Sequence, residues 1–321
     1  MIDAISNLVA TAILIAAIYG LVFWANRART DRSAIVGIYL LFGLPGGLLT
    51  VAGTALVINT DLGEGPFILG SGIAFLVPLI KPLRKLIARF TPMDPNSPID
   101  LCGLALILWV STFFTISAIQ SGPVDVDSEG GGQLLESSFW LLLNALTFVG
   151  IAYVAVGYRI YRTGQEATKR LGLEWPDLKT ILISLAMVIP CYIVAIIGNA
   201  LTLIFQPDVF DNLQDTMDDM TTGLDNPIGM ILIGLSAGIG EEVLFRGAIQ
   251  PRFGIVIAAL FWTTMHAQYD VSFVLVGLFG VGIVLGLQRK YFGTASAIIT
   301  HAVYNMIAVA ITIAGGHILW F

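Results

Sequence analysis

Long apolar segments run through this sequence, and they constrain its fold more than any other feature. A run of about 17–25 apolar residues is long enough to cross a membrane as a helix. About ten such candidate spans occur, at 4–25, 34–58, 67–80, 101–120, 138–158, 178–205, 227–245, 254–269, 271–288 and 293–314. Only 12% of the residues are charged, roughly half the usual share of a soluble domain. We therefore expect an all-α, polytopic integral membrane helix bundle with about 8–10 transmembrane helices.

The few charged residues alternate in sign from one loop to the next. All 16 Lys and Arg residues fall in five clusters: Arg27/Arg29/Arg32, Lys81/Arg84/Lys85/Arg89, Arg159/Arg162/Lys169/Arg170/Lys179, Arg246/Arg252 and Arg289/Lys290. The loops between these clusters are acidic. Because basic residues near span ends stay on the cytoplasmic side, we expect both termini to lie outside, in the plasma membrane of a prokaryote.

The positions of spans and loops divide the chain into three regions. These are 1–90, with N-terminal spans and a basic interfacial segment; 99–226, with middle spans and acidic outer loops; and 227–314, the candidate catalytic core. The segment 67–80 is short and contains Pro78, so we expect it to be broken or re-entrant. The segment 81–98 predicts an interfacial helix followed by a stiff proline linker.

The remaining loops and the overall charge narrow the class of protein further. Residues 121–136 include Gly130–Gly132 and predict a flexible loop, whereas 206–226 is acidic and predicts a solvated outer connection. The net charge of −6 offers no attraction for nucleic acid, so we expect no nucleic-acid partner. Cys102 and Cys191 lie in apolar runs without the spacing of a disulfide framework.

Two adjacent acids stand inside an apolar segment, between Gly240 and Gly247. Glu242 and Arg246 are four residues apart, so they share a helix face and can pair. Glu241 points about 100° away from that face, and a carboxylate without a cation suits a proton acceptor from water. The alternative is that both acids simply mark the cytoplasmic end of a span.

Histidines mark two further segments. Trp262 and His266 are about one helical turn apart and share a face, although a lone histidine is commonly a core residue bonded to a backbone carbonyl. His301 and Asn305 share a face in the same way, and two neutral donors suit a developing oxyanion. An interhelical hydrogen-bond pair is the alternative for these two. We expect His317 to be exposed and to have no catalytic role.

A carboxylate, a histidine and a His/Asn pair on nearby helices can together activate a water molecule and stabilise a tetrahedral intermediate. The combination therefore supports the hypothesis of a hydrolase that works with water inside the membrane.

These motifs resemble those of the CPBP family, also called Abi proteins, which comprises the type II CAAX prenyl endopeptidases and their prokaryotic relatives. The family carries EExxxR, FxxxH and HxxxN on successive helices, and this chain has Glu241-Glu242-x-x-x-Arg246, Trp262-x-x-x-His266 and His301-x-x-x-Asn305. The resemblance covers about residues 227–314 and is highly specific in combination. Trp262 stands where the family has Phe, and we expect this aromatic to shape a pocket.

The resemblance implies an intramembrane endopeptidase. The implied catalytic residues are Glu241, His266, His301 and Asn305, and the implied supporting residues are Glu242, Arg246 and Trp262. In this scheme Glu241 and His266 activate the hydrolytic water, and His301 and Asn305 bind the oxyanion. The implied partners are membrane lipid and a peptide or protein substrate, which is prenylated for the family's eukaryotic members.

No cofactor is expected, although the family was once viewed as metalloproteases. Glu241, His266 and His301 would supply three ligands if zinc were used. We favour a mechanism without metal because no HExxH motif is present and the family's glutamate mechanism fits.

Two rival functions remain open at this point. Gly234-Leu235-Ser236-Ala237-Gly238 matches GxSxG, which would suit a rhomboid-like serine protease that uses Ser236. Small residues at this spacing are more typical of helix packing. A protein without catalytic activity is the other rival: a proton-coupled transporter relays protons through intramembrane carboxylates and histidines, and an immunity or scaffold protein needs no turnover.

Overall fold

The computed structural model is built from helices. It describes residues 2–59, 63–121, 133–221 and 223–314, and no β-strand occurs in these ranges. The all-α prediction is therefore confirmed. The predicted flexible loop around Gly130–Gly132 and the predicted exposed His317 lie outside the described residues.

The α-helices are α1 (Ile2–Arg27), α2 (Arg32–Asn59), α3 (Gly65–Leu76), α4 (Lys81–Ile87), α5 (Pro98–Ser121), α6 (Gln133–Ala155), α7 (Gly164–Leu171), α8 (Leu178–Ala186), α9 (Val188–Phe205), α10 (Pro207–Thr221), α11 (Pro227–Glu241), α12 (Gln250–Thr264), α13 (Val274–Phe292) and α14 (Thr294–Ile313). Short 3₁₀ turns lie at η1 (Val77–Leu79) and η3 (Ala267–Tyr269), and a π-helix, η2 (Glu242–Ile249), joins α11 to α12.

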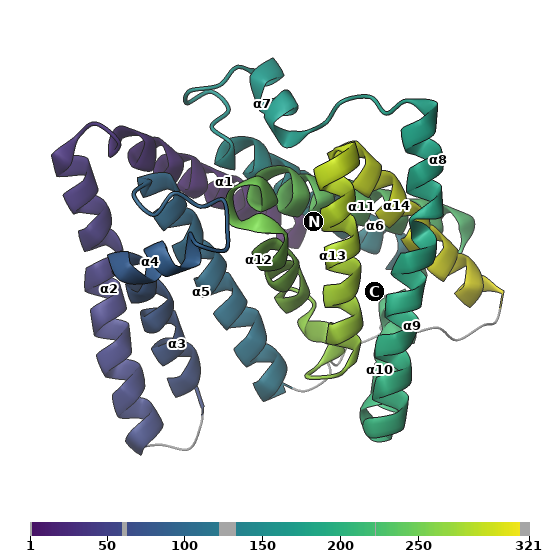
Figure 1. Cartoon of the computed structure of the whole chain (residues 1–321). Coiled ribbons are helices and arrows are strands. Elements are labelled where there is room, and N and C mark those ends of the chain that lie inside the picture. The colour runs from purple at the N-terminus through teal and green to yellow at the C-terminus, as the bar shows by residue number, and fades with distance from the viewer. Residues whose placement is uncertain (1, 60–62, 122–132, 222, 315–321) are drawn as a thin grey trace.

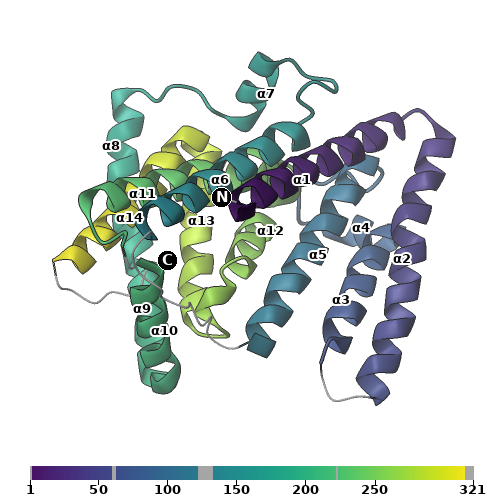
Figure 2. The ribbon, with the colours of Figure 1, turned by 180° about the vertical axis from the view of Figure 1, so that it is seen from behind.

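The long helices form two rows that cross one another (Figures 1 and 2). In one row each helix packs on the next in the order α2, α3, α5, α12, α13 and α9. In the other row the order is α1, α6, α11 and α14. The rows meet through η2, which packs on α12, and through α14, which packs on α13. This crossing brings the C-terminal helices together around η2.

The chain is a multi-pass membrane protein by helix length and hydropathy. Eight described helices are long and apolar enough to span a membrane, and a ninth arises if the bent pair Gly65–Leu79 and Lys81–Ile87 counts as one. The arms of that pair meet at 83°, so the segment around Pro78 is broken, as predicted. The count is below ten because Pro227–Thr264 runs as one helical stretch. Gly254 interrupts that stretch with φ 85° and ψ 169°, so its two arms correspond to two predicted segments.

The acidic segment 206–226 differs from its prediction as a solvated connection. Most of it forms α10, in which Leu213 is fully buried and Met217 nearly so. These two residues are four apart and pack into the main core, while Asp211 and Asp215 stay exposed. The prediction was wrong because the many aspartates make this segment polar on average, although its apolar residues recur once per helical turn and form the buried face of an amphipathic helix.

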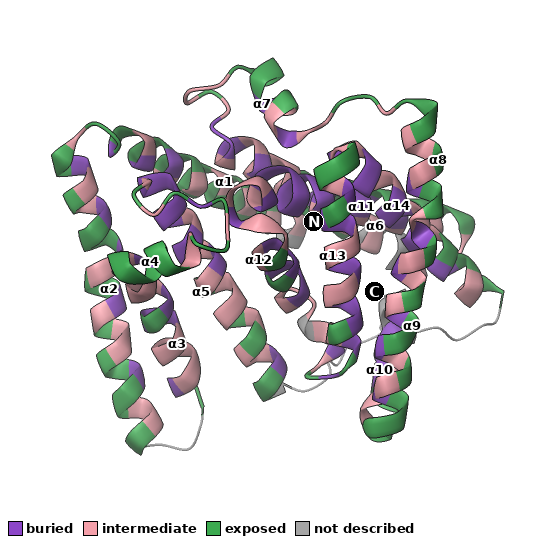
Figure 3. Ribbon diagram, viewed as in Figure 1, coloured by how far each residue is buried: buried purple, intermediate pink, exposed green. Residues whose placement is uncertain are grey.

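Buried residues gather where α11, η2, α12 and α14 meet, whereas α2 carries exposed residues along its length (Figure 3). Glycine allows some of the closest helix contacts: a Cβ on Gly198 of α9 would lie 2.9 Å from the Cα of Gly277 on α13. Backbone contact of this kind is typical of helix packing in membranes, where small residues let helices approach. The tightly packed region is the one that carries the candidate site.

Candidate active site

The two adjacent glutamates lie where an α-helix becomes a π-helix. Glu241 is the last residue of α11, and Glu242 opens η2; π-turns inside helices are frequent at functional sites. Glu242 and Arg246 are both fully buried, and Nε of Arg246 lies 3.2 Å from Oε2 of Glu242. The ion pair that the sequence spacing predicted is therefore present.

Glu242 also contacts His301 on α14. Nδ1 of His301 lies 2.9 Å from Oε1 of Glu242, so this carboxylate sits between an arginine and a histidine. An ionised carboxylate can only accept a hydrogen bond, so Nδ1 carries the proton in this contact. The other nitrogen, Nε2, can then donate only when the ring is an imidazolium. From the sequence, we expect His301 to be a neutral donor to an oxyanion. The contact with Glu242 means that His301 can donate through Nε2 only when its ring is protonated.

Trp262 is the hub of the site. Its side chain is buried, and its Nε1–H donates to Oε2 of Glu241 at 2.5 Å. The guanidinium carbon of Arg246 lies 4.9 Å from the indole ring centroid, within the range of a cation–π contact. The rings of His266 and His301 lie 4.6 and 5.8 Å from the indole, centroid to centroid. Trp262, the aromatic expected to shape a pocket, holds a carboxylate in the structure, which a phenylalanine at this position cannot do.

His266 follows Trp262 at the end of α12. Its Nδ1 lies 2.8 Å from the carbonyl oxygen of Trp262. A carbonyl can only accept, so Nδ1 donates, and a neutral His266 keeps a lone pair at Nε2. The backbone contact expected of a core histidine is thus present, yet it occupies one nitrogen and leaves the other for water. Glu241, His301 and Arg246 are close enough to interact electrostatically with this ring.

The site residues differ in how far they are exposed. Glu241 and His266 are partly exposed, whereas Glu242 and His301 are buried. The groups that would accept a proton from water are therefore the accessible ones. The carboxylate of Glu242, which is bonded to Arg246 and His301, is fully buried.

Asn305 lies one turn beyond His301 on α14 and is buried. Its Oδ1 has no hydrogen-bond partner among the described residues. An interhelical hydrogen-bond pair, the alternative interpretation, leaves that oxygen unexplained. Oδ1 can only accept a hydrogen bond, so it is open to a donor group of a bound substrate, and a donor role toward an oxyanion falls to Nδ2 of the same amide.

The three candidate zinc ligands do not form a metal site in this arrangement. Across the described part of the chain, no group of three or more His, Cys, Asp or Glu side chains is placed to hold a metal ion. One oxygen of Glu241 accepts from Trp262, and Nδ1 of His301 binds Glu242.

Ser236 belongs to a helix-packing seam. Its hydroxyl donates to the carbonyl of Ile233 on the preceding turn, at 3.3 Å. A Cβ on Gly238 would lie 3.0 Å from both the amide nitrogen of Ala302 and the carbonyl oxygen of Ile298 on α14. The glycines of the GxSxG match therefore serve the close approach of α11 and α14.

Three residues near the site had no assigned role in the sequence analysis. The ring of Tyr269 stacks on that of His266 at 6.1 Å between centroids and 14° between planes. Tyr192 of α9 donates its hydroxyl to the carbonyl of Tyr304 at 2.9 Å. The proximity of Tyr269 to His266 could have been predicted from the sequence, because the two residues are only three positions apart. The hydrogen bond between Tyr192 and Tyr304 joins helices more than a hundred residues apart in the sequence. No local sequence pattern predicts it.

Comparison with known proteins assigns the C-terminal part of the chain to a family. Residues 224–307 match the family described as Type II CAAX prenyl endopeptidase Rce1-like. No curated protein and no solved structure matches the chain. The matched range includes every residue of the three motifs. Residues 224–307 are therefore a domain of the Rce1-like type II CAAX prenyl endopeptidase family, the CPBP or Abi proteins, in a multi-pass membrane protein.

Proposed function

We propose that this protein is an intramembrane endopeptidase that hydrolyses a peptide bond with water activated by Glu241 and His266. One observation carries the proposal: the accessible carboxylate of Glu241 is held by the indole N–H of Trp262, on the residue whose carbonyl fixes His266. A positioned carboxylate and a histidine lone pair in one accessible place are the requirements for a general base.

The proposed reaction begins with a water molecule between Glu241 and His266. The water donates one hydrogen bond to Nε2 of His266 and gives its other proton to the Glu241 carboxylate as its oxygen attacks the peptide carbonyl carbon. The new C–O bond leaves a tetrahedral oxyanion. His301 and Asn305 donate hydrogen bonds to that oxyanion. Collapse breaks the C–N bond, and the departing amine takes the proton from Glu241, which restores the carboxylate.

Because Nδ1 of His301 bonds Glu242, the proposed donation to the oxyanion through Nε2 requires an imidazolium at His301. Glu241 and Glu242 contribute two negative charges, and Arg246 contributes one positive charge. A protonated His301, bonded to Glu242 at 2.9 Å, makes the cluster neutral overall. Neutral clusters are favoured where the surroundings are apolar, because an unpaired charge is costly there. In this scheme Glu242 supports His301 and takes no proton from water.

The proposed substrate is a peptide or protein segment at the membrane, lipidated or not. The alternating basic clusters support a topology with both termini outside, in a prokaryotic plasma membrane. The full set of site residues lies in the last third of the chain, so the preceding helices would form the surrounding bundle.

The experiment that tests this function compares the membrane proteomes of cells that express the protein with those of cells that express Glu241→Gln. New peptide ends should appear only with the unchanged protein. Ser236→Ala is the matched control, since its hydroxyl is bonded within its own helix, and it should leave the new ends in place. Loss of the ends in Ser236→Ala, with retention in Glu241→Gln, would instead favour the serine protease.

A further inference from the structure

A second candidate site lies at the end of the helix rows that carries the basic loops, and none of the proposed catalytic residues lines it. It is a cavity of about 420 Å³. Four chain segments line it: Arg29 after α1, Asp94–Asp100 before and at the start of α5, Tyr161 and Arg162 after α6, and Arg252 in the first turn of α12. Segments this far apart in the sequence converge only in the folded chain.

The cavity carries an excess of positive charge. Arg252 forms an ion pair with Asp100, which neutralises one arginine and the more buried acid. Asp94 accepts the backbone N–H of Asn96 at 2.9 Å and bonds no arginine. Among the described residues, neither Arg29 nor Arg162 is in an ion pair. Two guanidinium groups therefore face the one remaining carboxylate, that of Asp94, which leaves the cavity with an excess of one positive charge. One nitrogen of Arg162 also donates to the carbonyl of Val156.

Neighbouring arginines extend this excess. Burial, together with Arg252, Arg162 and Arg289, lowers the pKa of Arg170 to about 10. Glu166, four residues after Arg162, is engaged in the N-terminal cap of α7 with Thr163 and also interacts electrostatically with Arg162. Arginines that disfavour one another's charge are stabilised by an added anion.

Tyr161 supplies an unused hydrogen-bonding group on the cavity wall. Its hydroxyl oxygen is buried and has no hydrogen-bond partner among the described residues. The guanidinium carbon of Arg162 lies 4.8 Å from the centroid of its ring. Tyr161 thus has a hydroxyl without a partner beside a guanidinium group, and buried polar groups without partners are rare in folded proteins.

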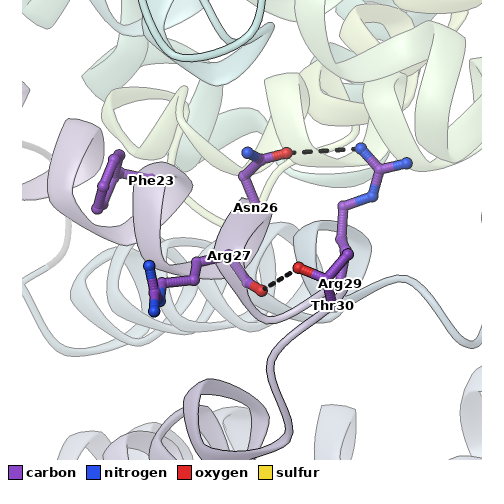
Figure 4. A pocket seen from close by; sticks show the side chains of 5 residues that line it. All are labelled: Phe23, Asn26, Arg27, Arg29 and Thr30. Carbon is purple, nitrogen blue, oxygen red and sulfur yellow. Dashed lines mark hydrogen bonds between the residues drawn. The ribbon is translucent and has the colours of Figure 1, made fainter.

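An adjacent cavity indicates where the anion comes from. This cavity, of about 580 Å³, is lined by Phe23, Asn26, Arg27, Arg29 and Thr30 (Figure 4). It shares Arg29 with the first cavity, and Phe23 is 53% exposed on α1, a candidate membrane span. A cationic cavity beside an exposed aromatic at the end of a span matches a lipid, whose phosphate adjoins its acyl chains. Inorganic phosphate has no group that would contact Phe23.

We propose that Arg29, Tyr161 and Arg162 bind the phosphate group of an anionic membrane lipid, with its glycerol and acyl region along Phe23. Basic pockets between membrane helices bind such head groups through charge-assisted hydrogen bonds. This site is independent of the proposed peptidase activity, because it rests on no residue of the catalytic motifs.

The test is native mass spectrometry of the full chain in detergent, titrated with phosphatidylglycerol, with phosphatidylcholine or with inorganic phosphate. We expect saturable binding of phosphatidylglycerol. Arg29→Gln should weaken it by about fivefold, the usual effect of one basic residue on anionic lipid. Tyr161→Phe should weaken it by a similar factor without any change of charge. If Arg162→Gln fails to fold, these two variants still decide the outcome.

Arg32→Gln is the matched control, because Arg32 is exposed at the first residue of α2, three residues after Arg29, and lines neither of the two cavities. It should leave phosphatidylglycerol binding unchanged. Equal weakening by Arg32→Gln, or no effect of Tyr161→Phe, would show diffuse attraction and overturn the site. Equal binding of phosphatidylcholine would also overturn it, and equal binding of inorganic phosphate would show that the ligand is a soluble anion.

Discussion

The indole Nε1 of Trp262 lies 2.5 Å from Oε2 of Glu241, and this hydrogen bond joins the end of α12 to the end of α11. It fixes one oxygen of the proposed general base and leaves the other oxygen for water. The same tryptophan binds Nδ1 of His266 through its carbonyl. Both residues that would activate the water are thus positioned by one buried side chain and its backbone.

Trp262→Phe should slow peptide cleavage while preserving the fold. Phenylalanine keeps an aromatic ring against Arg246 and removes the N–H that Glu241 accepts. A hydrogen bond to a charged group contributes about 1.5–3 kcal/mol, so kcat/KM should fall by roughly 10- to 100-fold. Steady-state cleavage assays of the two purified proteins measure this ratio. Activity within twofold of the unchanged protein would mean that this hydrogen bond does not position the base.

Glu242→Gln and Arg246→Gln should destabilise the protein, in contrast with Glu241→Gln. Glu242 and Arg246 are fully buried and pair at 3.2 Å, and removal of one partner from a buried pair costs about 3–5 kcal/mol. Thermal unfolding in detergent, followed by circular dichroism, measures the difference. The double variant should lose less than the sum of the two single losses, because the charges are coupled. A midpoint for Glu242→Gln equal to that of Glu241→Gln would contradict the supporting role.

Gly254→Ala should lower stability chiefly through the backbone, although a Cβ there would also lie 3.3 Å from Cδ of Pro92. Gly254 has φ 85° and ψ 169°, a region that is essentially restricted to glycine, and strain of this kind costs about 1–3 kcal/mol. Gly20→Ala is the matched control, because a Cβ there would meet no atom within 4 Å. Thermal unfolding should therefore show a lower midpoint for Gly254→Ala than for Gly20→Ala. The opposite order would mean that the break in α12 relaxes without cost.

The helices were predictable because each apolar run in a membrane must satisfy its own backbone hydrogen bonds. Every predicted span corresponds to a helix, and even the broken segment around Pro78 was expected. The prediction was wrong at 206–226, where the aspartates hid the buried stripe of Leu213 and Met217. It also missed that 227–264 continues through a π-helix up to the break at Gly254.

The site was predictable only where its contacts are local. The pairing of Glu242 with Arg246 follows from four-residue spacing on one helix. The contact of Glu242 with His301 joins residues 59 positions apart, and helix packing alone decides it. The shared helix face of Trp262 and His266 follows from their four-residue spacing. The hydrogen bond from Trp262 to Glu241 joins two helices and could not be predicted from that spacing.

Cleavage of a peptide by the purified Glu241→Gln protein tests the central claim most directly. Glutamine keeps the shape of the side chain and can still bond Trp262, but it cannot take a proton from water. A general base accelerates such reactions by about 10²–10⁴-fold, so single-turnover cleavage of a substrate identified from the proteome should fall by that factor. The unfolding midpoint should change little. Cleavage at the unchanged rate by Glu241→Gln would contradict the assignment of Glu241 as the base.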